Sequence, residues 1–169
     1  MEYGNIFKSL TSAIVFFSQN GHTRQLARIL QEETSSDLFE IVSCTRYPSN
    51  YQAMIEYAKR EINGFFCPEI ETKFQDPSIY SVIFVGSPNW WFDVAPPLAT
   101  FLSTTDLSGK IIIPFITHGG GTIGRCETKI REMCPNSEVH ESLYLPGIFS
   151  KLSRTQVQHF LCQTAKKLA

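Results

Sequence analysis

The sequence predicts one α/β domain, built as a doubly wound parallel sheet with helices on both faces. Short, continuous apolar runs of strand length alternate five times with amphipathic stretches of helix length, an order typical of a parallel sheet covered on both sides. The 169 residues are the size of one domain, and no repeat, low-complexity tract or linker divides them. We therefore expect a single domain over 1–169, in which 1–10 is a short N-terminal extension.

The first half of the chain supplies two strand and helix pairs. Residues 13–17 are apolar throughout, as expected for a strand buried on both faces. Thr23 is expected to cap the helix that follows, because apolar residues recur on one helical face from there to residue 30. A second apolar run at 38–42 predicts the next strand. A second helix is expected over 51–62, where the charges fall on one side and an Asn-Gly pair ends the pattern.

The second half repeats the alternation three times. Pro96 and Pro97 favour a helix start, since proline suits the first helical turn. Ser153 is expected to cap the last helix, and a Pro-Gly pair ends the last strand. In order, the predicted elements are a strand at 81–86, a helix at 96–102, a strand at 110–116, a helix at 125–133, a weaker strand at 138–145 and a helix at 153–168.

Charge and composition exclude several classes of protein. Fifteen basic and sixteen acidic side chains give a net charge of −1, which argues against a broadly basic nucleic-acid binder. No apolar run approaches the roughly 20 residues that span a bilayer, and the first residues lack the order of a secretory signal, so we expect a cytoplasmic protein without membrane attachment. The five cysteines form no CxxC pair and no zinc-like spacing with histidine, so free thiols and no metal are expected.

The first strand ends in a loop that can bind an anion. Ligands of such sheets bind beyond the carboxyl ends of the strands, where small polar residues can turn backbone N–H groups toward a phosphate beside a helix N-terminus. The loop contains no Lys or Arg, and His22 is its only titratable group. An ordinary turn between strand and helix would use the same residue types. The loop consists of Ser18, Gln19, Asn20, Gly21, His22 and Thr23.

Two further strand ends carry an aromatic loop and a glycine loop. Tryptophans at the edge of the sheet can stack on a flat aromatic ligand, although they could also pack against the next helix. Three successive glycines let a ligand edge approach the backbone directly, although such a run is also typical of a plain surface loop. The aromatic loop contains Pro88, Asn89, Trp90 and Trp91, followed by Phe92, and the glycine loop contains Thr117, His118, Gly119, Gly120 and Gly121.

Several rival chemistries are excluded because their motifs are absent. The sequence contains no G-x-G-x-x-G fingerprint and no G-x-S-x-G nucleophile motif. Lys110 is followed by Ile111 where a P-loop needs Ser or Thr. Ser87 stands where a phosphoacceptor regulator would carry an aspartate.

At these three loops the chain resembles the flavodoxin-like FMN proteins, and most of all the short-chain bacterial flavodoxin subgroup with Pro-x-Trp-Trp and Thr-x-Gly-Gly loops. The resemblance covers Ala13 to Leu145. It implies a five-stranded flavodoxin-like sheet in the order 2-1-3-4-5, FMN as the cofactor, and no metal. It also implies which residues bind the cofactor: Ser18, Gln19, Asn20, Gly21, His22 and Thr23 at the phosphate, and Pro88, Asn89, Trp90, Trp91, Thr117, His118, Gly119, Gly120 and Gly121 around the flavin ring.

The implied function is electron transfer through bound FMN, to a redox partner protein or a small-molecule oxidant. The nearly neutral charge leaves open an NAD(P)H-dependent FMN reductase of quinones or other small molecules, since electron-carrying flavodoxins are usually acidic. A partner-binding module without flavin is a further alternative. Phe92 and Asp93 stand where the family often has a flexible glycine, which predicts a low yield of one-electron-reduced flavin. Cys126 lies near a helix start, where a thiol pKa can fall, but we expect no role for it.

Overall fold

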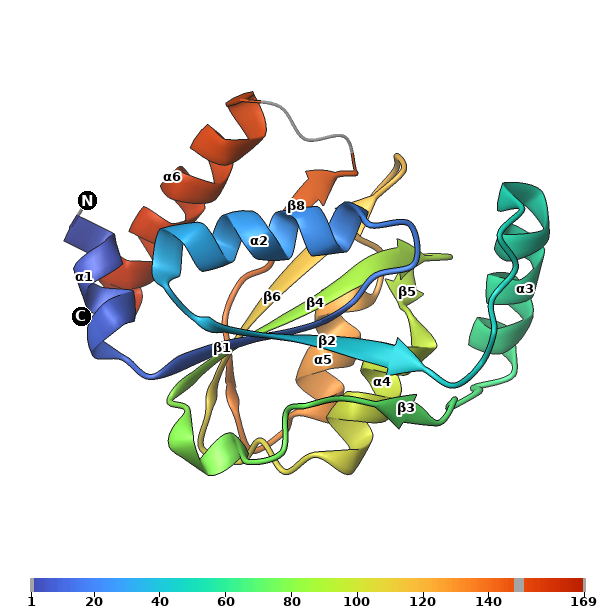
Figure 1. Cartoon of the computed structure of the whole chain (residues 1–169), viewed down its shortest axis with the longest axis horizontal. Coiled ribbons are helices and arrows are strands. Elements are labelled where there is room, and N and C mark those ends of the chain that lie inside the picture. Colours follow the sequence, from blue (N-terminus) through green and yellow to red (C-terminus); the bar gives the residue numbers. More distant parts are fainter. Residues whose placement is uncertain (1, 148–150, 169) are drawn as a thin grey trace.

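The computed structural model describes residues 2–147 and 151–168 and confirms the predicted α/β fold (Figure 1). Its helices are α1 (Glu2–Ser9), α2 (His22–Thr34), α3 (Tyr51–Asn63), α4 (Pro96–Thr104), α5 (Cys126–Met133) and α6 (Lys151–Leu168), with one 3-10 turn at Pro77–Ile79. Its strands are β1 (Ser12–Phe17), β2 (Asp37–Ser43), β3 (Ile70–Glu71), β4 (Val82–Trp90), β5 (Asp93–Val94), β6 (Ile111–His118), β7 (Glu138–Val139) and β8 (Leu143–Pro146).

The sheet is mainly parallel, with its strands in the order β3-β2-β1-β4-β6-β7, and β8 also pairs with β6. The four long strands β2, β1, β4 and β6 follow the order that the resemblance implies. The expectation of five parallel strands needs two corrections. The short strands β3 and β5 are antiparallel additions, and the fifth strand is divided into β7 and β8, both parallel to β6.

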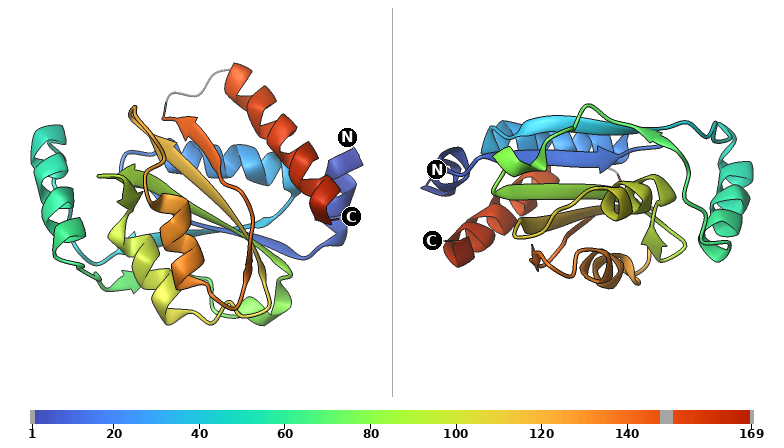
Figure 2. Two further views of the ribbon diagram at one scale, coloured as in Figure 1. Left: turned by 180° about the vertical axis from the view of Figure 1, so that it is seen from behind. Right: turned by 90° about the horizontal axis from the view of Figure 1, so that it is seen from below.

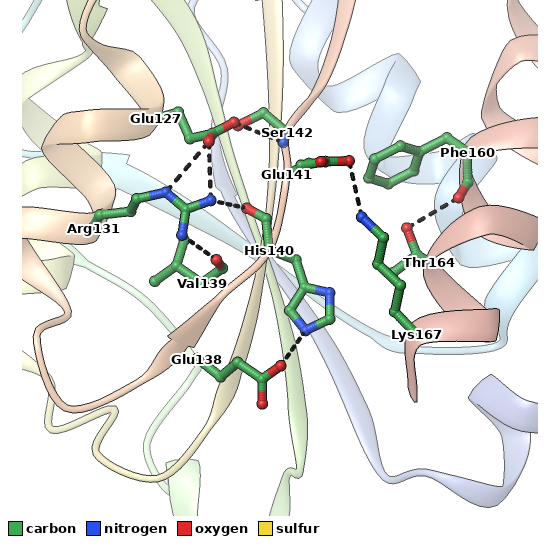
Figure 3. Close-up of polar contacts among 10 residues, drawn as sticks. All are labelled: Glu127, Arg131, Glu138, Val139, His140, Glu141, Ser142, Phe160, Thr164 and Lys167. Carbon is green, nitrogen blue, oxygen red and sulfur yellow. Dashed lines mark hydrogen bonds and ion pairs between the residues drawn. The ribbon is translucent and has the colours of Figure 1, made fainter. Parts of the chain in front are cut away.

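Polar side chains fill the break in the fifth strand (Figure 3). The guanidinium of Arg131 on α5 donates to the backbone carbonyls of Val139 and His140 and to Glu127 Oε1. The other oxygen of Glu127 accepts the N–H of Ser142 at 2.9 Å. Backbone groups around the break between β7 and β8 therefore bond to side chains of α5.

The long strands β1, β4 and β6 are buried on both faces along their apolar runs, whereas in β2 only Ile41 is buried. Along β1, Val15 and Phe17 belong to the core beneath α4 and α5, whereas Ile14 and Phe16 belong to the core beneath α2 and α6. All six β1 residues are buried. Figure 2 shows the two helix layers on opposite sides of the sheet.

The N-terminal extension is a helix, which the sequence analysis did not foresee. Phe7 is 1% exposed and packs against Phe84 of β4, with 5.7 Å between the ring centroids. Helix α1 lies beside α6 at the amino edge of the sheet (Figures 1 and 2). Helix α6 begins at Lys151, so Ser153, the expected cap, lies inside the helix. No helix among the described residues is long and apolar enough to cross a membrane.

Helix α3 lies on neither face of the sheet. It stands beyond the carboxyl edge, as Figures 1 and 2 show from three directions. The helix forms because Asn50 caps it, its side chain accepting the N–H of Ala53 at 3.0 Å. Met54 and Ala58 on its inner side are buried. Helix α3 therefore faces the carboxyl ends of the strands from outside the sheet.

Candidate functional site

A cavity of about 620 Å³ opens at the carboxyl edge of the sheet, within the range of roughly 300–1,000 Å³ that is usual for ligand pockets. The loops that follow β1, β4 and β6 all line it, as does the inner face of α3. Thirteen of the fifteen residues that the resemblance assigned to the cofactor line this cavity, and the two that do not are Gly21 and Gly121. The structure thus brings the three predicted loops together around one space.

The first loop is shaped to receive an anion. Ser18 Oγ accepts the backbone N–H groups of Gly21 and Arg24 at 3.1 and 3.2 Å, so its own proton remains free to donate elsewhere. Gly21 precedes α2 with a φ of 88°, in the left-handed region that favours glycine. Helix α2 begins at His22, so Thr23, the expected cap, is its second residue. The N–H groups of His22 and Thr23 remain as first-turn donors for a ligand.

The hydroxyls of Thr23 and Thr117 join the first loop to the glycine loop. Their oxygens lie 2.8 Å apart, and both side chains are buried. Each hydroxyl can donate one hydrogen bond and accept others, so the pair can redirect its hydrogen bonds toward a bound group. Two residues that are 94 positions apart in the sequence therefore meet at the cavity floor.

The guanidinium of Arg24 lies next to the first loop, although Arg24 is not part of that loop. The guanidinium of Arg24 reaches back to Gly21, with Nη1 3.5 Å from the position that a Cβ atom would take there. Its Nε and Nη2 bond to the carboxylate of Glu40 at 2.5 to 3.1 Å. The sequence analysis missed this group because Arg24 lies beyond the loop. Its charge is matched by Glu40.

The aromatic loop is a tight hairpin between β4 and β5. Trp90 pairs with Asp93, which leaves Trp91 and Phe92 as the two turn residues, with φ values of 51° and 66°. Left-handed backbone in two bulky residues costs roughly 1–3 kcal/mol each. The turn is held by hydrogen bonds, since Asn89 Oδ1 accepts the N–H of Phe92 and the Phe92 carbonyl accepts the N–H of Arg125.

The two tryptophans of the hairpin have different environments. Trp90 is 9% exposed and packs edge-on against Phe17 and Tyr47, with centroid distances of 5.7 and 5.2 Å. Trp91 is 42% exposed, and its indole N–H donates to the Ile55 carbonyl of α3 at 2.8 Å. The ammonium of Lys59 lies 4.9 Å from the Trp91 ring centroid. Trp90 is thus part of the core, whereas Trp91 connects the hairpin to α3.

The glycine loop is connected to its neighbours through Tyr144 of β8. The His118 and Tyr144 rings stack with centroids 4.0 Å apart at an angle of 15°. The Tyr144 hydroxyl lies 3.4 Å from both the Gly121 carbonyl and Asn89 Nδ2. His118 Nδ1 is buried without a hydrogen-bond partner, and burial lowers the pKa of this imidazole. His118 therefore favours its neutral form in the cavity wall.

Helix α3 contributes residues that the sequence analysis did not assign to the site. Tyr51, Met54, Ile55 and Ala58 recur at helical spacing and line the cavity together. The sequence did indicate an apolar inner face for this helix. The pattern does not indicate whether that face covers the sheet or a ligand cavity.

Cys126 is remote from solvent at the start of α5. Cys126 is fully buried, and burial together with the nearby Asp93 carboxylate raises the pKa of its thiol to about 12. The thiol is therefore kept protonated, the form that is the weaker nucleophile. Within residues 2–147 and 151–168, no cluster of three or more His, Cys, Asp or Glu side chains could hold a metal ion.

Comparisons with known proteins point to one family. A family model described as Flavodoxin matches residues 11–163. No curated protein matches the sequence. Among solved structures, a candidate flavoprotein from Bacteroides eggerthii DSM 20697 is similar at 25% identity with a TM-score of 0.77, covering 90% of this chain and 98% of its own. A flavoprotein from Lactobacillus acidophilus NCFM, crystallised with FMN, shares 23% identity over 89% of this chain and 97% of its own, with a TM-score of 0.71.

Proposed function

Because the chain belongs to the flavodoxin family, we propose that its cavity binds FMN and that the bound flavin transfers electrons to a redox partner protein or a small-molecule oxidant. The observation that carries this proposal is the convergence of three loops, from β1, β4 and β6, on one cavity of about 620 Å³. The Lactobacillus acidophilus flavoprotein, which has the same fold and was crystallised with FMN, supports it.

The two ends of the cavity match the two ends of FMN. The β1 loop offers neutral donors, namely the first-turn N–H groups of α2 and the hydroxyls of Ser18 and Thr23, and such donors suit a phosphate group. The aromatic hairpin and the bare backbone of Gly119 and Gly120 suit a flat ring with a polar edge. The residues present therefore fit the cofactor.

The bound flavin would supply the redox chemistry, and the chain would bind and orient it. Thr23 and Thr117 would fix the phosphate end relative to the glycine loop. The hairpin is held in place by bonds from Asn89 and to Arg125, so Trp91 would meet the ring without rearrangement. Helix α3 would shield the ring from water on the side that the sheet leaves open.

One observation favours reduction of a small molecule as a second candidate function. The inner face of α3 presents Met54, Ile55 and Ala58 to the cavity, an apolar surface that suits a flat oxidant such as a quinone. In that case NAD(P)H would reduce the flavin and the quinone would then accept two electrons. The sequence contains no recognisable nicotinamide-binding motif.

Binding of FMN and riboflavin to the purified apoprotein tests the proposal. FMN should bind much more tightly than riboflavin, which lacks the phosphate. Thr23→Ala should weaken FMN binding by about 1–3 kcal/mol, the range for leaving a buried polar group unpaired. It should leave riboflavin binding unchanged. Equal affinities for the two flavins would show that the β1 loop is only a turn.

A second measurement separates the two candidate functions. The FMN-loaded protein is mixed with NADPH and a naphthoquinone, and the consumption of NADPH is followed. Steady turnover would identify a reductase. Absence of turnover, together with rapid electron exchange with a redox protein, would identify a carrier. Absence of any flavin binding would indicate a partner-binding module.

A further inference from the structure

Helix α3 is joined to the sheet through Tyr47, a residue of the loop that precedes the helix. The Tyr47 ring packs edge-on against Phe17 of β1 and Trp90 of β4, with centroid distances of 6.0 and 5.2 Å. Its other contacts are on α3, where the Tyr57 ring lies 5.7 Å away and Glu61 Oε2 accepts the Tyr47 hydroxyl at 3.0 Å. Tyr47 therefore connects the helix to two strands beside the cavity.

Glu61 is a carboxylic acid buried on the inner face of α3. The residue is 6% exposed and follows Met54 and Ala58, the other buried residues of the helix, at helical spacing. Its Oε1 is buried and has no hydrogen-bond partner among the described residues. Burial of an ionised carboxylate with one oxygen unpaired is costly, whereas burial of the neutral acid costs less.

The pKa values of the two groups reflect this burial. Burial raises the pKa of the Glu61 carboxyl group, and the hydrogen bond from Tyr47 opposes the rise by a smaller amount. Burial and the neighbouring carboxylate also raise the pKa of Tyr47, so its hydroxyl remains a donor. The titratable group in contact with Glu61 is thus a neutral phenol.

The other titratable groups near this contact do not compensate the Glu61 charge. Arg60 and Lys59 of α3 each lie over an aromatic ring, at 5.5 and 4.9 Å from the ring centroids. The exposed thiol of Cys67, in the segment after the helix, donates to a backbone carbonyl of its own segment. Neither these groups nor Arg46 in the preceding loop contribute to the pKa of Glu61. Ionised Glu61 would therefore be an uncompensated buried charge.

We propose that Glu61 and Tyr47 make the position of α3 depend on pH: the helix stays against the sheet while Glu61 is protonated and detaches more often once Glu61 is ionised. Because α3 lines the cavity, flavin should enter and leave faster as the pH rises. This part of the inference rests on the proposed function and names a regulation of the same site.

The direction of the effect follows from linkage. The docked helix holds the Glu61 proton more tightly than a detached helix, because detachment returns the carboxyl group to water. Docking is therefore strongest below about pH 4.3, the pKa of an exposed glutamate, and weakens as the pH rises through the raised pKa of Glu61. The population of the detached helix should increase about tenfold over this range, the effect expected of one unpaired buried polar atom.

Hydrogen exchange of the apoprotein measures detachment without any flavin. After correction for the intrinsic exchange rate, the protection of the α3 amides should fall about tenfold between about pH 4.5 and about pH 7.5. Glu61→Gln, a neutral isostere of the protonated acid, should abolish this fall. The matched control is Glu56→Gln on the exposed side of the same helix, which should keep the wild-type profile. Exchange that is insensitive to low urea concentrations would identify local detachment and not unfolding of the whole domain.

A second variant tests the hydrogen bond itself. Tyr47→Phe keeps the ring that packs against β1 and β4 and removes the donor that favours ionised Glu61. The fall in α3 protection with pH should therefore be larger than in the wild type. An unchanged profile would contradict the role assigned to Tyr47.

Stopped-flow mixing connects the helix to the cavity. The dissociation rates of FMN and of riboflavin should both increase about tenfold between the two pH values in the wild type, and neither should change in Glu61→Gln. An increase shared by riboflavin, which has no phosphate, assigns the effect to α3 and not to phosphate ionisation.

The outcomes separate this inference from the proposed function. Protection of α3 that does not change with pH, or that falls equally in Glu61→Gln, would overturn the inference and leave FMN binding intact. The same holds if protection falls but the flavin rates stay constant. A pH-dependent helix in a protein that binds no flavin would instead overturn the proposed function.

Discussion

Replacing Trp91 by alanine should weaken FMN binding and leave the fold nearly intact, whereas the same change at Trp90 should destabilise the fold itself. The difference follows from their surroundings. Trp90 is 9% exposed and packs against Phe17 and Tyr47, whereas Trp91 is 42% exposed at the mouth of the cavity. Adjacent residues of one type would thus produce two separable defects.

The expected magnitudes follow from these contacts. Truncating a buried large aromatic residue costs about 3–5 kcal/mol, a large part of the roughly 5–15 kcal/mol that stabilises a domain. At Trp91 the fold loses one hydrogen bond to Ile55, worth about 0.5–1.5 kcal/mol, and one contact with Lys59, worth about 0.5–1 kcal/mol. Loss of a stacked ring should weaken FMN about tenfold.

Urea unfolding of the apoprotein and FMN titration followed by flavin fluorescence measure the two effects separately. Trp91→Ala should brighten the residual flavin emission, because a stacked indole quenches the excited ring. Trp91→Phe keeps a ring and removes the N–H, so it should retain most of the affinity. If Trp91→Ala leaves both affinity and emission unchanged, or if it destabilises the fold as much as Trp90→Ala, the assignment is wrong.

Three further outcomes are expected. Burial raises the pKa of Glu61, against a smaller opposing effect of the hydrogen bond from Tyr47. The folded state therefore holds this proton more tightly than the unfolded state. Stability to urea should decline as pH rises from about 4.3, the pKa of an unfolded glutamate, through the raised pKa of Glu61 in the folded protein. Glu61→Gln should remove that part of the decline. Gly124→Ala should lower the free energy of unfolding by about 2–4 kcal/mol, because its Cβ would lie 2.4 Å from Phe92 and its φ is 60°. Gly109→Ala, with a φ of 74° and no atom near its Cβ, should lose only the free energy of the strained backbone. Stepwise dithionite reduction of the FMN-loaded protein should show little long-wavelength absorbance from one-electron-reduced flavin, since the Phe92 carbonyl already accepts the N–H of Arg125. A strong, stable blue colour would contradict this.

Phe92 stands where the family often has a flexible glycine, and a bulky residue at such a position is expected to avoid a left-handed backbone. In the structure both turn residues already adopt one, with φ values of 51° and 66°. Neither of the two turn positions is Asn or Gly, which are the usual signals of such a turn. The turn is stabilised by distant groups, including the Arg125 N–H, which local sequence cannot reveal.

The parallel core could be predicted because its signal is local. A strand buried on both faces has a nearly continuous apolar run, and residues 13–17 of β1 and 82–85 of β4 show this directly. The position of α3 could not be predicted, since an amphipathic helix has the same pattern whether it covers a sheet or a cavity. The break in the fifth strand depends on Arg131, whose partners lie up to nine residues away. The helical extension depends on Phe7 meeting Phe84, a contact across 77 positions that the local sequence of the N-terminal segment does not indicate.

The neighbouring positions of α1 and α6 have a practical consequence. Helix α1 and the C-terminal end of α6 lie side by side at the amino edge of the sheet, opposite the cavity (Figures 1 and 2). A tether on either end would attach the molecule to an electrode or a fused module with the cavity mouth facing outward. A short peptide could also join the two ends, so that new termini could be opened elsewhere in a circular permutant.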